Sequence, residues 1–357
     1  MSSTAVTPTQ SAPKSEVARI PTLDGIRAIS ILFVLFGHAA FNPASPAIFI
    51  GLQDYANFGV RIFFVLSGFL ITTLLLNEGN RHGSLSLKKF YLRRVFRIFP
   101  ASYAYIVFIG ILSIFGYLQL RHNDWFAAAL YWMNFHQNRG WWLGHLWSLA
   151  VEEQFYLIWP AVLAWSGWKF GRWAALFVVV AMPIFRISLY YQLLQFLWLI
   201  GYGAFFVVAD ALAWGCLLAG FRDRLELSSW YRRLATMPMA AVVFGSAQYA
   251  AKLAGAHPRW AALFLWTWMD IAIAFSIHAC VLNADSVVGR FLEFRPLAFL
   301  GVLSYSLYLW QQLFMNYHQD ALFPNPLIGM LLALVAAASS YYVIEKPFLR
   351  MKQRLFP

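Results

Sequence analysis

An arginine and a histidine in the first apolar segment have the types and the spacing to carry out chemistry inside a membrane. Ten mostly apolar residues separate Arg27 from His38. Eleven steps of about 100° make three turns plus roughly 20°, so one helix face carries both side chains, about 16 Å apart along the axis. Ionisable residues in lipid usually face a site or an aqueous cavity. The alternative is one basic anchor and one structural, buried imidazole.

A second polar stripe lies in the apolar segment 144–165. One helix face there carries four polar side chains at spacings of three or four residues: His145, Ser148, Glu152 and Tyr156. A rise of 1.5 Å per residue places Glu152 about 10 to 15 Å below the outer edge of the membrane, a depth similar to that of His38. This predicts a catalytic pair in which Glu152 orients His38 and stabilises its protonated form. A structural buried pair is the alternative.

A basic cluster with interleaved aromatic residues occupies the segment 88–100. Guanidinium groups suit phosphate oxygens, and aromatic faces can stack on a base, so the cluster is a candidate nucleotide-binding site. A positive anchor on the inner side of a membrane would need the same residues. The basic residues of the cluster are Lys88, Lys89, Arg93, Arg94 and Arg97.

Several other polar groups interrupt the apolar segments. Ser67 and Gly68 allow close approach between helices, and tight packing is the first interpretation, with a ligand contact second. The segment 304–312 brings hydroxyls and amides into the membrane, including Tyr305, where interhelical hydrogen bonds are expected. Three further charges are expected to pair or to face a cavity: Arg61, Asp210 and Asp270.

The composition excludes a soluble domain. Of the 357 residues, 61% are hydrophobic and only 12% are charged. We therefore predict an all-α fold, a polytopic bundle of about ten transmembrane helices. The segment 124–135 is expected at the outer interface or as a partial span. The expected spans are 23–42, 57–77, 98–119, 144–165, 173–190, 197–220, 235–253, 260–282, 297–316 and 325–344.

The distribution of basic residues predicts that both termini are cytoplasmic. The net charge of +12 reflects this topology rather than a nucleic-acid partner. We expect a disordered cytoplasmic tail at 1–18, a transmembrane domain at 19–350 and a short basic cytoplasmic tail at 351–357. Cys216 and Cys280 lack metal-ligand spacing, so no metal site is expected. With the N-terminus inside, few basic residues fall in outer loops: Arg121, Arg139, Arg186, Lys252 and Arg259.

Six motifs in a fixed order resemble the acyltransferase-3 family of membrane-bound O-acyltransferases, the OafA/YrhL type, over residues from about 19 to 350. They are LDGIRAISILFVLFGH, FFVLSGFLIT, FYLRRVFRIFP, HLWSLAVEEQFYLIWP, LGVLSYSLYLW and VIEKP. The resemblance implies that His38 is essential for acyl transfer. It also implies an acyl-CoA-binding group of Arg27, Arg93, Arg94 and Arg97. The supporting residues are Ser67, Gly68, Trp147, Ser148, Tyr156 and Tyr305.

Two departures from the family pattern bear on the mechanism. Members often carry an acidic residue where this chain has Arg61, and many carry a histidine where it has Gln311. A mechanism that needs the second histidine is therefore in doubt, so His38 and Glu152 are expected to suffice for proton handling. Many relatives also carry a C-terminal hydrolase-like domain, and we expect this chain to be the stand-alone form.

The resemblance implies an O-acyltransferase of the bacterial inner membrane with no tightly bound cofactor. The implied donor is acyl-CoA, most often acetyl-CoA, and the implied acceptor is a carbohydrate or another hydroxylated molecule of the cell envelope. The nucleotide would lie on the arginines of the basic cluster, with the pantetheine arm along the stripe from Arg27 to His38. General-base catalysis by His38 and an acyl-histidine relay both remain open. A transporter or translocase of a lipid-linked sugar is the alternative, and consumption of the thioester separates the two.

Overall fold

The computed structural model describes residues 20–191, 205–317, 322–323 and 325–356, and this part of the chain is helical, without strands. The longer helices are α1 (Pro21–Ala39), α2 (Tyr55–His82), α3 (Leu87–Ile114), α6 (Leu146–Tyr190), α7 (Phe205–Leu227), α9 (Met237–Ala256), α11 (Trp266–Leu282), α13 (Arg295–Phe314) and α14 (Pro326–Ser340). The shorter elements are η1 (Ala47–Phe49), α4 (Asp124–Ala129), η2 (Met133–Phe135), α5 (Trp141–Gly144), α8 (Ser229–Leu234), α10 (Pro258–Trp260), η4 (Ala261–Leu265), α12 (Val287–Leu292), η5 (Tyr341–Glu345) and α15 (Lys346–Leu355).

Local sequence explains where several helices begin and end. Pro21 occupies the first turn of α1, where its missing N–H costs nothing. Gly83 ends α2 with a φ of 70°, which a glycine adopts without strain. Ser86 accepts a hydrogen bond from the Lys89 N–H at the start of α3. Gly167, with φ 66° and ψ 179°, kinks α6 and turns the chain between two apolar stretches.

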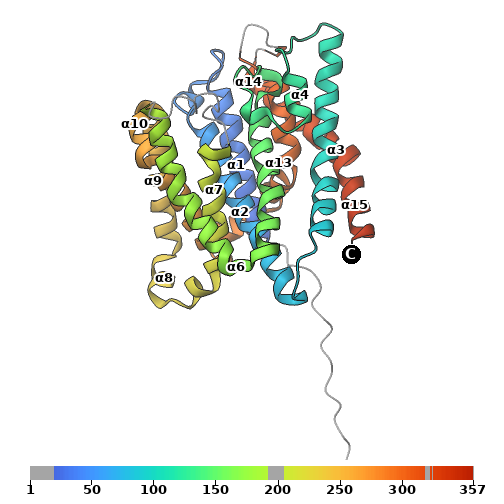
Figure 1. Ribbon diagram of the computed structural model, residues 1–357. Helices are drawn as coiled ribbons and strands as arrows, with labels where there is room; N and C mark the ends of the chain where they lie inside the picture. Colours follow the sequence, from blue (N-terminus) through green and yellow to red (C-terminus); the bar gives the residue numbers. More distant parts are fainter. Residues whose placement is uncertain (1–19, 192–204, 318–321, 324, 357) are drawn as a thin grey trace, which may run out of the picture.

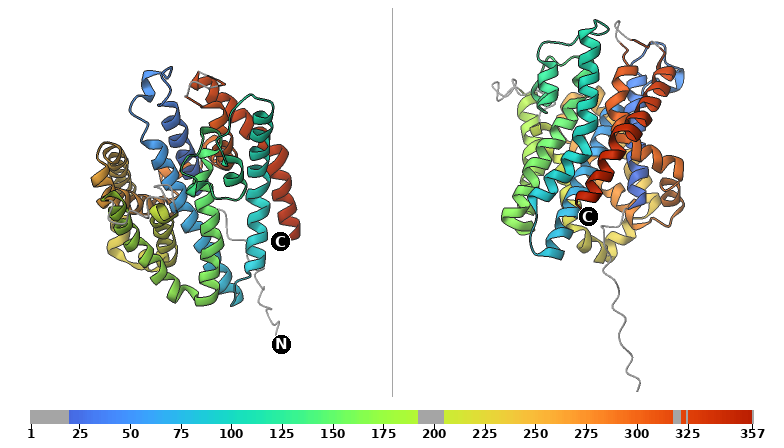
Figure 2. Two further views of the ribbon diagram at one scale, coloured as in Figure 1. Left: turned by 45° about the horizontal axis from the view of Figure 1, so that its top comes forward. Right: turned by 90° about the vertical axis from the view of Figure 1, so that its right-hand side faces the viewer.

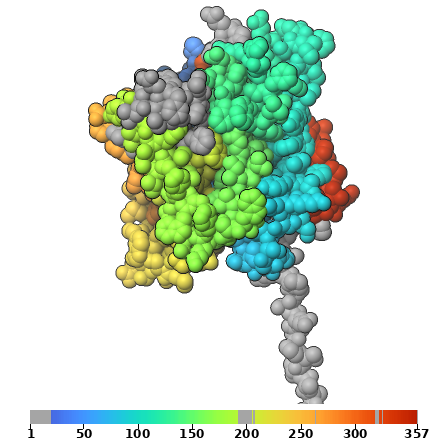
Figure 3. All heavy atoms as spheres, in the orientation of Figure 1, coloured from blue at the N-terminus to red at the C-terminus, as the bar shows by residue number. Residues whose placement is uncertain are grey.

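Six helical runs of the described residues are long and apolar enough to cross a membrane, and α11 is shorter but apolar. The expected spans 144–165 and 173–190 both lie in one run, Trp141–Tyr190, and 197–220 lies partly outside the described residues. The count of ten therefore stays a prediction. Large apolar side chains are exposed on the outward surfaces of α3 and α6, as lipid contact requires. Figure 3 shows these two helices side by side on one face.

Helix α2 lies in the centre of the bundle and packs against α1, α6 and α7 (Figures 1 and 2). Its side chains Phe58, Phe64 and Phe69 are fully buried. A Cβ atom on Gly68 would collide with the Leu212 carbonyl of α7, so this glycine permits close contact between the two helices. The packing interpretation of this glycine is confirmed.

The two ends of the bundle hold different segments of the chain. The start of α1, the turn between α2 and α3, and α8 lie at the lower end in Figure 1, whereas α4 and α10 lie at the upper end. The segment 124–135 forms the short elements α4 and η2, and the basic cluster 88–97 belongs to the lower end. Within the expected basic tail at 351–357, helix α15 continues to Leu355. The expected tail at 1–18 lies outside the described residues.

Candidate active site

Two cavities lie within the bundle, one above the other. The outer cavity, about 640 Å³, is lined by His38 and by residues of α2, α5, α7 and η4. The inner cavity, about 330 Å³, is lined by Arg27, Arg94, Arg97 and Glu152. Val60 and Tyr308 line both, so they form part of the wall between the two spaces. The stripe from Arg27 to His38 along α1 therefore connects one cavity to the other.

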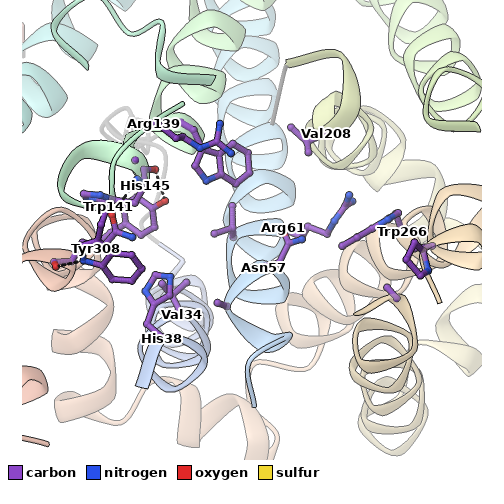
Figure 4. A pocket seen from close by; sticks show the side chains of 18 of the residues that line it. Val34, His38, Asn57, Arg61, Arg139, Trp141, His145, Val208, Trp266 and Tyr308 are labelled. Atoms are coloured by element: carbon purple, nitrogen blue, oxygen red, sulfur yellow. Dashed lines mark hydrogen bonds between the residues drawn. The ribbon is translucent and has the colours of Figure 1, made fainter. Parts of the chain in front are cut away.

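The His38 ring is held in a defined orientation at the outer cavity. Its Nδ1 lies 2.7 Å from Oε1 of Gln311, on α13. An amide oxygen only accepts, so Nδ1 carries the hydrogen and Nε2 keeps its lone pair. The edge of Trp141 packs against the ring at 5.6 Å between centroids, and its Nε1 donates to the Gln312 carbonyl. Figure 4 shows His38, Trp141 and Tyr308 grouped on one side of α2. The arrangement suits a general base.

The predicted pairing of His38 with Glu152 is wrong. The Glu152 carboxylate accepts a hydrogen bond from Ser67 at 2.7 Å, and the Tyr156 hydroxyl donates to the same Ser67 oxygen at 3.1 Å. Glu152 lines the inner cavity and His38 lines the outer one, so the carboxylate is not the group that orients the ring. The prediction used only the depth of each residue along its own helix. The lateral positions of the helices place α13, rather than Glu152 of α6, beside His38.

Tyr308 joins α13 to α6 at the wall between the cavities. Its hydroxyl donates to the His145 carbonyl at 2.8 Å and accepts from Ser148 at 2.6 Å. The His145 ring lies against Tyr308 and contacts the Leu309 carbonyl through Nε2 at 3.1 Å. His145 and Ser148, two residues of the predicted polar stripe, are therefore hydrogen-bonded to α13. They fix the tyrosine ring where the inner space meets the outer one.

The structure separates the predicted arginines. Arg27 pairs with Asp24 at 2.9 Å, and the Arg94 guanidinium lies over the Tyr156 ring at 4.8 Å. These two arginines and Arg97 line the inner cavity, whereas Arg93 of the same helix is not among its lining residues. Adjacent residues on a helix point about 100° apart, so Arg94 can line the cavity while Arg93 points away from it.

The remaining predicted residues lie around the cavities. The Tyr305 hydroxyl donates to the Ile98 carbonyl at 2.7 Å, and Tyr305 lines the inner cavity. Trp147 lines the outer cavity and packs edge-on against Phe64. The role of Gln311, the place of Tyr308 in the wall and the contact of Trp141 were not predicted. The position of Gln311 in the family pattern, where a histidine is common, was the available signal.

Gln311→Leu is expected to lower kcat about 10- to 100-fold, because the Nδ1–H loses its acceptor and the ring loses its fixed orientation. The leucine fills nearly the same buried volume, so thermal stability should stay close to that of the unsubstituted protein. Gln311→Glu keeps an acceptor oxygen and should retain more activity than the leucine variant. Steady-state rates with thermal unfolding of each variant check this. Equal losses in both variants would contradict a role in orienting the ring.

Comparisons with known proteins identify the family of the chain. Residues 20–345 match the family described as Acyltransferase domain. The chain is 32% identical to the peptidoglycan O-acetyltransferase OatA of Listeria monocytogenes over 82% of this chain and 48% of that protein. It is 30% identical to the putative peptidoglycan O-acetyltransferase YrhL of Bacillus subtilis over 92% and 54%, respectively. It is 27% identical to the O-acetyltransferase OatA of Staphylococcus aureus over 92% of this chain and 57% of that protein.

The chain spans about half the length of these curated relatives. No solved structure matches it. The family match covers both cavities, from the start of α1 to the end of η5. It includes Arg27 and His38 of the first motif and Gln311, which directly follows the fifth motif. The chain therefore belongs to the acyltransferase-3 family, whose domain forms its transmembrane helical bundle.

Proposed function

We propose that this protein is an O-acyltransferase that transfers an acyl group, acetyl in the simplest case, from acyl-CoA to a hydroxyl of a cell-envelope carbohydrate. The observation that carries the proposal is the His38 ring at the outer cavity, with Nδ1 bound by Gln311 and Nε2 left to accept a proton. The relatives named as O-acetyltransferases of peptidoglycan support the chemistry and the class of acceptor.

The charge of the bundle supports an orientation in the bacterial cytoplasmic membrane. Basic residues gather at the end that holds the turn between α2 and α3, and we place this end in the cytoplasm, together with both termini. The inner cavity then faces the cytosolic donor. The outer cavity faces the side where envelope carbohydrates are assembled. Acyl transfer between the cavities carries the acyl group across the membrane without moving CoA.

The inner cavity suits the donor. Arg94 and Arg97 offer guanidinium groups for the phosphates of CoA, and Arg27 lies further along the cavity. Glu152, Ser67 and Tyr156 supply polar groups for the amides of the pantetheine arm. The cavity is otherwise lined largely by apolar side chains, so the arm can extend toward Tyr308 and the wall with the outer cavity.

The reaction follows from the placement of His38. Nε2 takes the proton of the acceptor hydroxyl as the hydroxyl oxygen attacks the thioester carbonyl. The C–O bond forms and the C–S bond breaks. The imidazolium returns its proton to the departing thiolate, which leaves an ester and free CoA. An acyl-histidine formed on the same Nε2 would give the same products in two steps.

Acyl transfer by purified protein in proteoliposomes tests the function. Acetyl-CoA supplied at the basic end should release free CoA, and the acetyl group should appear on a glycan fragment supplied at the opposite face. A translocase would move the glycan without releasing CoA. No thioester cleavage with any hydroxylated acceptor would overturn the proposal.

The same assay tests the donor site. Arg94→Gln is expected to raise the KM for acetyl-CoA about 10-fold with a smaller change in kcat, because a lost phosphate contact weakens ground state and transition state alike. Arg93→Gln is the matched control and should leave the KM within about twofold, because Arg93 does not line the cavity. The effect of Arg94→Gln should shrink with S-acetylpantetheine, which lacks the nucleotide. Equal effects of the two variants would contradict this assignment.

A further inference from the structure

The outer cavity carries an excess of positive charge that the transfer reaction alone does not require. Four arginines line it, and among its lining residues in the described part of the chain none is an aspartate or a glutamate. The four are Arg61, Arg121, Arg139 and Arg186. Arginines of this lining that have no carboxylate partner would make the cavity attract anions over neutral molecules.

Two of these charges are already compensated deep in the bundle. Arg61 binds Asp270 with contacts of 2.8 and 2.7 Å, and Arg186 binds Asp210 at 2.7 Å. Trp266 packs over the Arg61 guanidinium at 4.4 Å. Figure 4 shows Arg61 and Trp266 on the side of α2 opposite His38. These two ion pairs form part of the cavity wall, and their arginines are not free to bind a ligand anion.

Arg139 differs from them. It is half-buried, its guanidinium lies 5.8 Å from the Trp147 ring, and no carboxylate of the described chain forms an ion pair with it. Partly desolvating a guanidinium without an anion is costly, and the cost is recovered when an anionic ligand binds. Arg139 is therefore the group of this cavity that is best placed to take an anion.

The loop that carries Arg139 is held in place. The Asp124 carboxylate accepts hydrogen bonds from the Gly140 N–H at 3.1 Å and the Arg121 N–H at 3.0 Å, and it contacts His136 at 3.0 Å. Trp141, two residues beyond Arg139, packs against the His38 ring. An anion bound by Arg139 would therefore lie at a fixed position relative to the catalytic imidazole.

A second polar group in the same cavity lacks a partner. His145 is 4% exposed, lines the cavity, and its Nδ1 has no hydrogen-bond partner among the described residues. A buried nitrogen of this kind is normally satisfied, and a polar ligand in the cavity would satisfy it. Nε2 of the same ring contacts the Leu309 carbonyl and therefore carries the hydrogen, so Nδ1 is left as an acceptor for a ligand hydroxyl. Arg139 thus indicates an anionic ligand, and the His145 Nδ1 indicates that this ligand also carries a hydroxyl.

We propose that the outer cavity selects an acidic carbohydrate acceptor, with Arg139 binding a carboxylate or phosphate group beside the hydroxyl that His38 activates. This inference rests on the proposed acyltransferase function. A guanidinium binds both oxyanions through two parallel N–H bonds, so the shared chemistry is the anionic group. The group fixes the sugar in register with Nε2, and neutral sugars lack this anchor.

Acceptor kinetics with three methyl glycosides test the inference: a neutral hexoside, the corresponding uronoside and the corresponding hexoside phosphate. The unsubstituted protein should use one or both anionic acceptors with a KM at least about 10-fold below that of the neutral one. Arg139→Gln should remove this difference by raising the KM and lowering the kcat for the anionic acceptor, with the KM for acetyl-CoA nearly unchanged. Arg139→Lys should restore part of the preference. The uronoside and the phosphate show which anion is preferred.

Arg259→Gln is the matched control, because it removes an exposed arginine at the same end that does not line the cavity. Its acceptor preference should equal that of the unsubstituted protein. Equal kcat/KM for neutral and anionic acceptors, or an Arg139→Gln effect of equal size on both, would overturn the inference. Calorimetric titration of the glycosides without donor separates the two proposals. Selective binding that depends on Arg139, without CoA release in any assay, would refute the acyltransferase function and retain the anion site.

Discussion

Replacing His38 with alanine is expected to lower the rate of acyl transfer by about 10²- to 10⁴-fold, the contribution typical of a positioned general base. The ring is the group at the outer cavity whose orientation is fixed by a hydrogen bond to Nδ1 while Nε2 stays available. The loss should fall on kcat, because proton transfer occurs in the transition state rather than on binding. CoA release and acetyl incorporation into the acceptor measure it.

Two controls separate catalysis from folding. The His38 ring is half-buried at a cavity, so thermal unfolding in detergent should change little in His38→Ala. The double variant His38→Ala with Gln311→Leu should be no slower than His38→Ala alone, because Gln311 acts through the ring. Additive losses in log rate would show that Gln311 acts independently. A His38→Ala protein with the full rate of transfer would remove the histidine from the mechanism.

The second large effect is expected on stability. Arg61→Leu should lower the free energy of unfolding by about 3 to 5 kcal/mol, because it leaves the Asp270 carboxylate buried without its cation. The Arg61 and Asp270 side chains are 3% and 0% exposed. Asp210 forms the neighbouring ion pair with Arg186. The variant therefore leaves the carboxylates of Asp270 and Asp210 with Arg186 as the one arginine of the two ion pairs. Thermal unfolding and the monodisperse fraction after purification measure the change.

The double variant Arg61→Leu with Asp270→Leu provides the control for this effect. Apolar residues of similar size replace both charges, so most of the stability should return, since no lone charge is left in the bundle. A double variant as unstable as Arg61→Leu would mean that the arginine acts through packing on Trp266 instead. The pair also compensates the charge of Arg61, the residue that departs from the family pattern, because the cation of α2 has its counter-charge on α11.

The expectation that Arg61, Asp210 and Asp270 pair or face a cavity is confirmed, because all three pair and Arg61 also lines the outer cavity. The sequence could indicate that these charges need partners, because an isolated charge in an apolar run is costly. It could not identify Arg186 as the partner of Asp210, because that arginine was assigned to an outer loop. The kink at Gly167 and the length of α6 bring Arg186 beside α7 instead.

Composition and the length of the apolar runs were sufficient to predict an all-helical membrane bundle. The repeat of 3.6 residues was sufficient to place Arg27 and His38 on one face of α1, because their relative position depends on distances within a single helix. The same reasoning placed His145, Ser148 and Glu152 on one face of α6. Each of these three residues lines one of the two cavities.

The partners across helices could not be predicted in this way. Gln311 lies 273 residues from His38, and Ser67 lies 85 residues from Glu152. The depth of a residue along its own helix gives one coordinate, whereas a hydrogen bond also depends on the rotation and lateral position of the neighbouring helix. Close packing of helix against helix, as at Gly68 where the missing Cβ lets α2 approach the α7 backbone, sets those positions. For this reason the histidine and the glutamate, predicted at one depth, lie in different cavities.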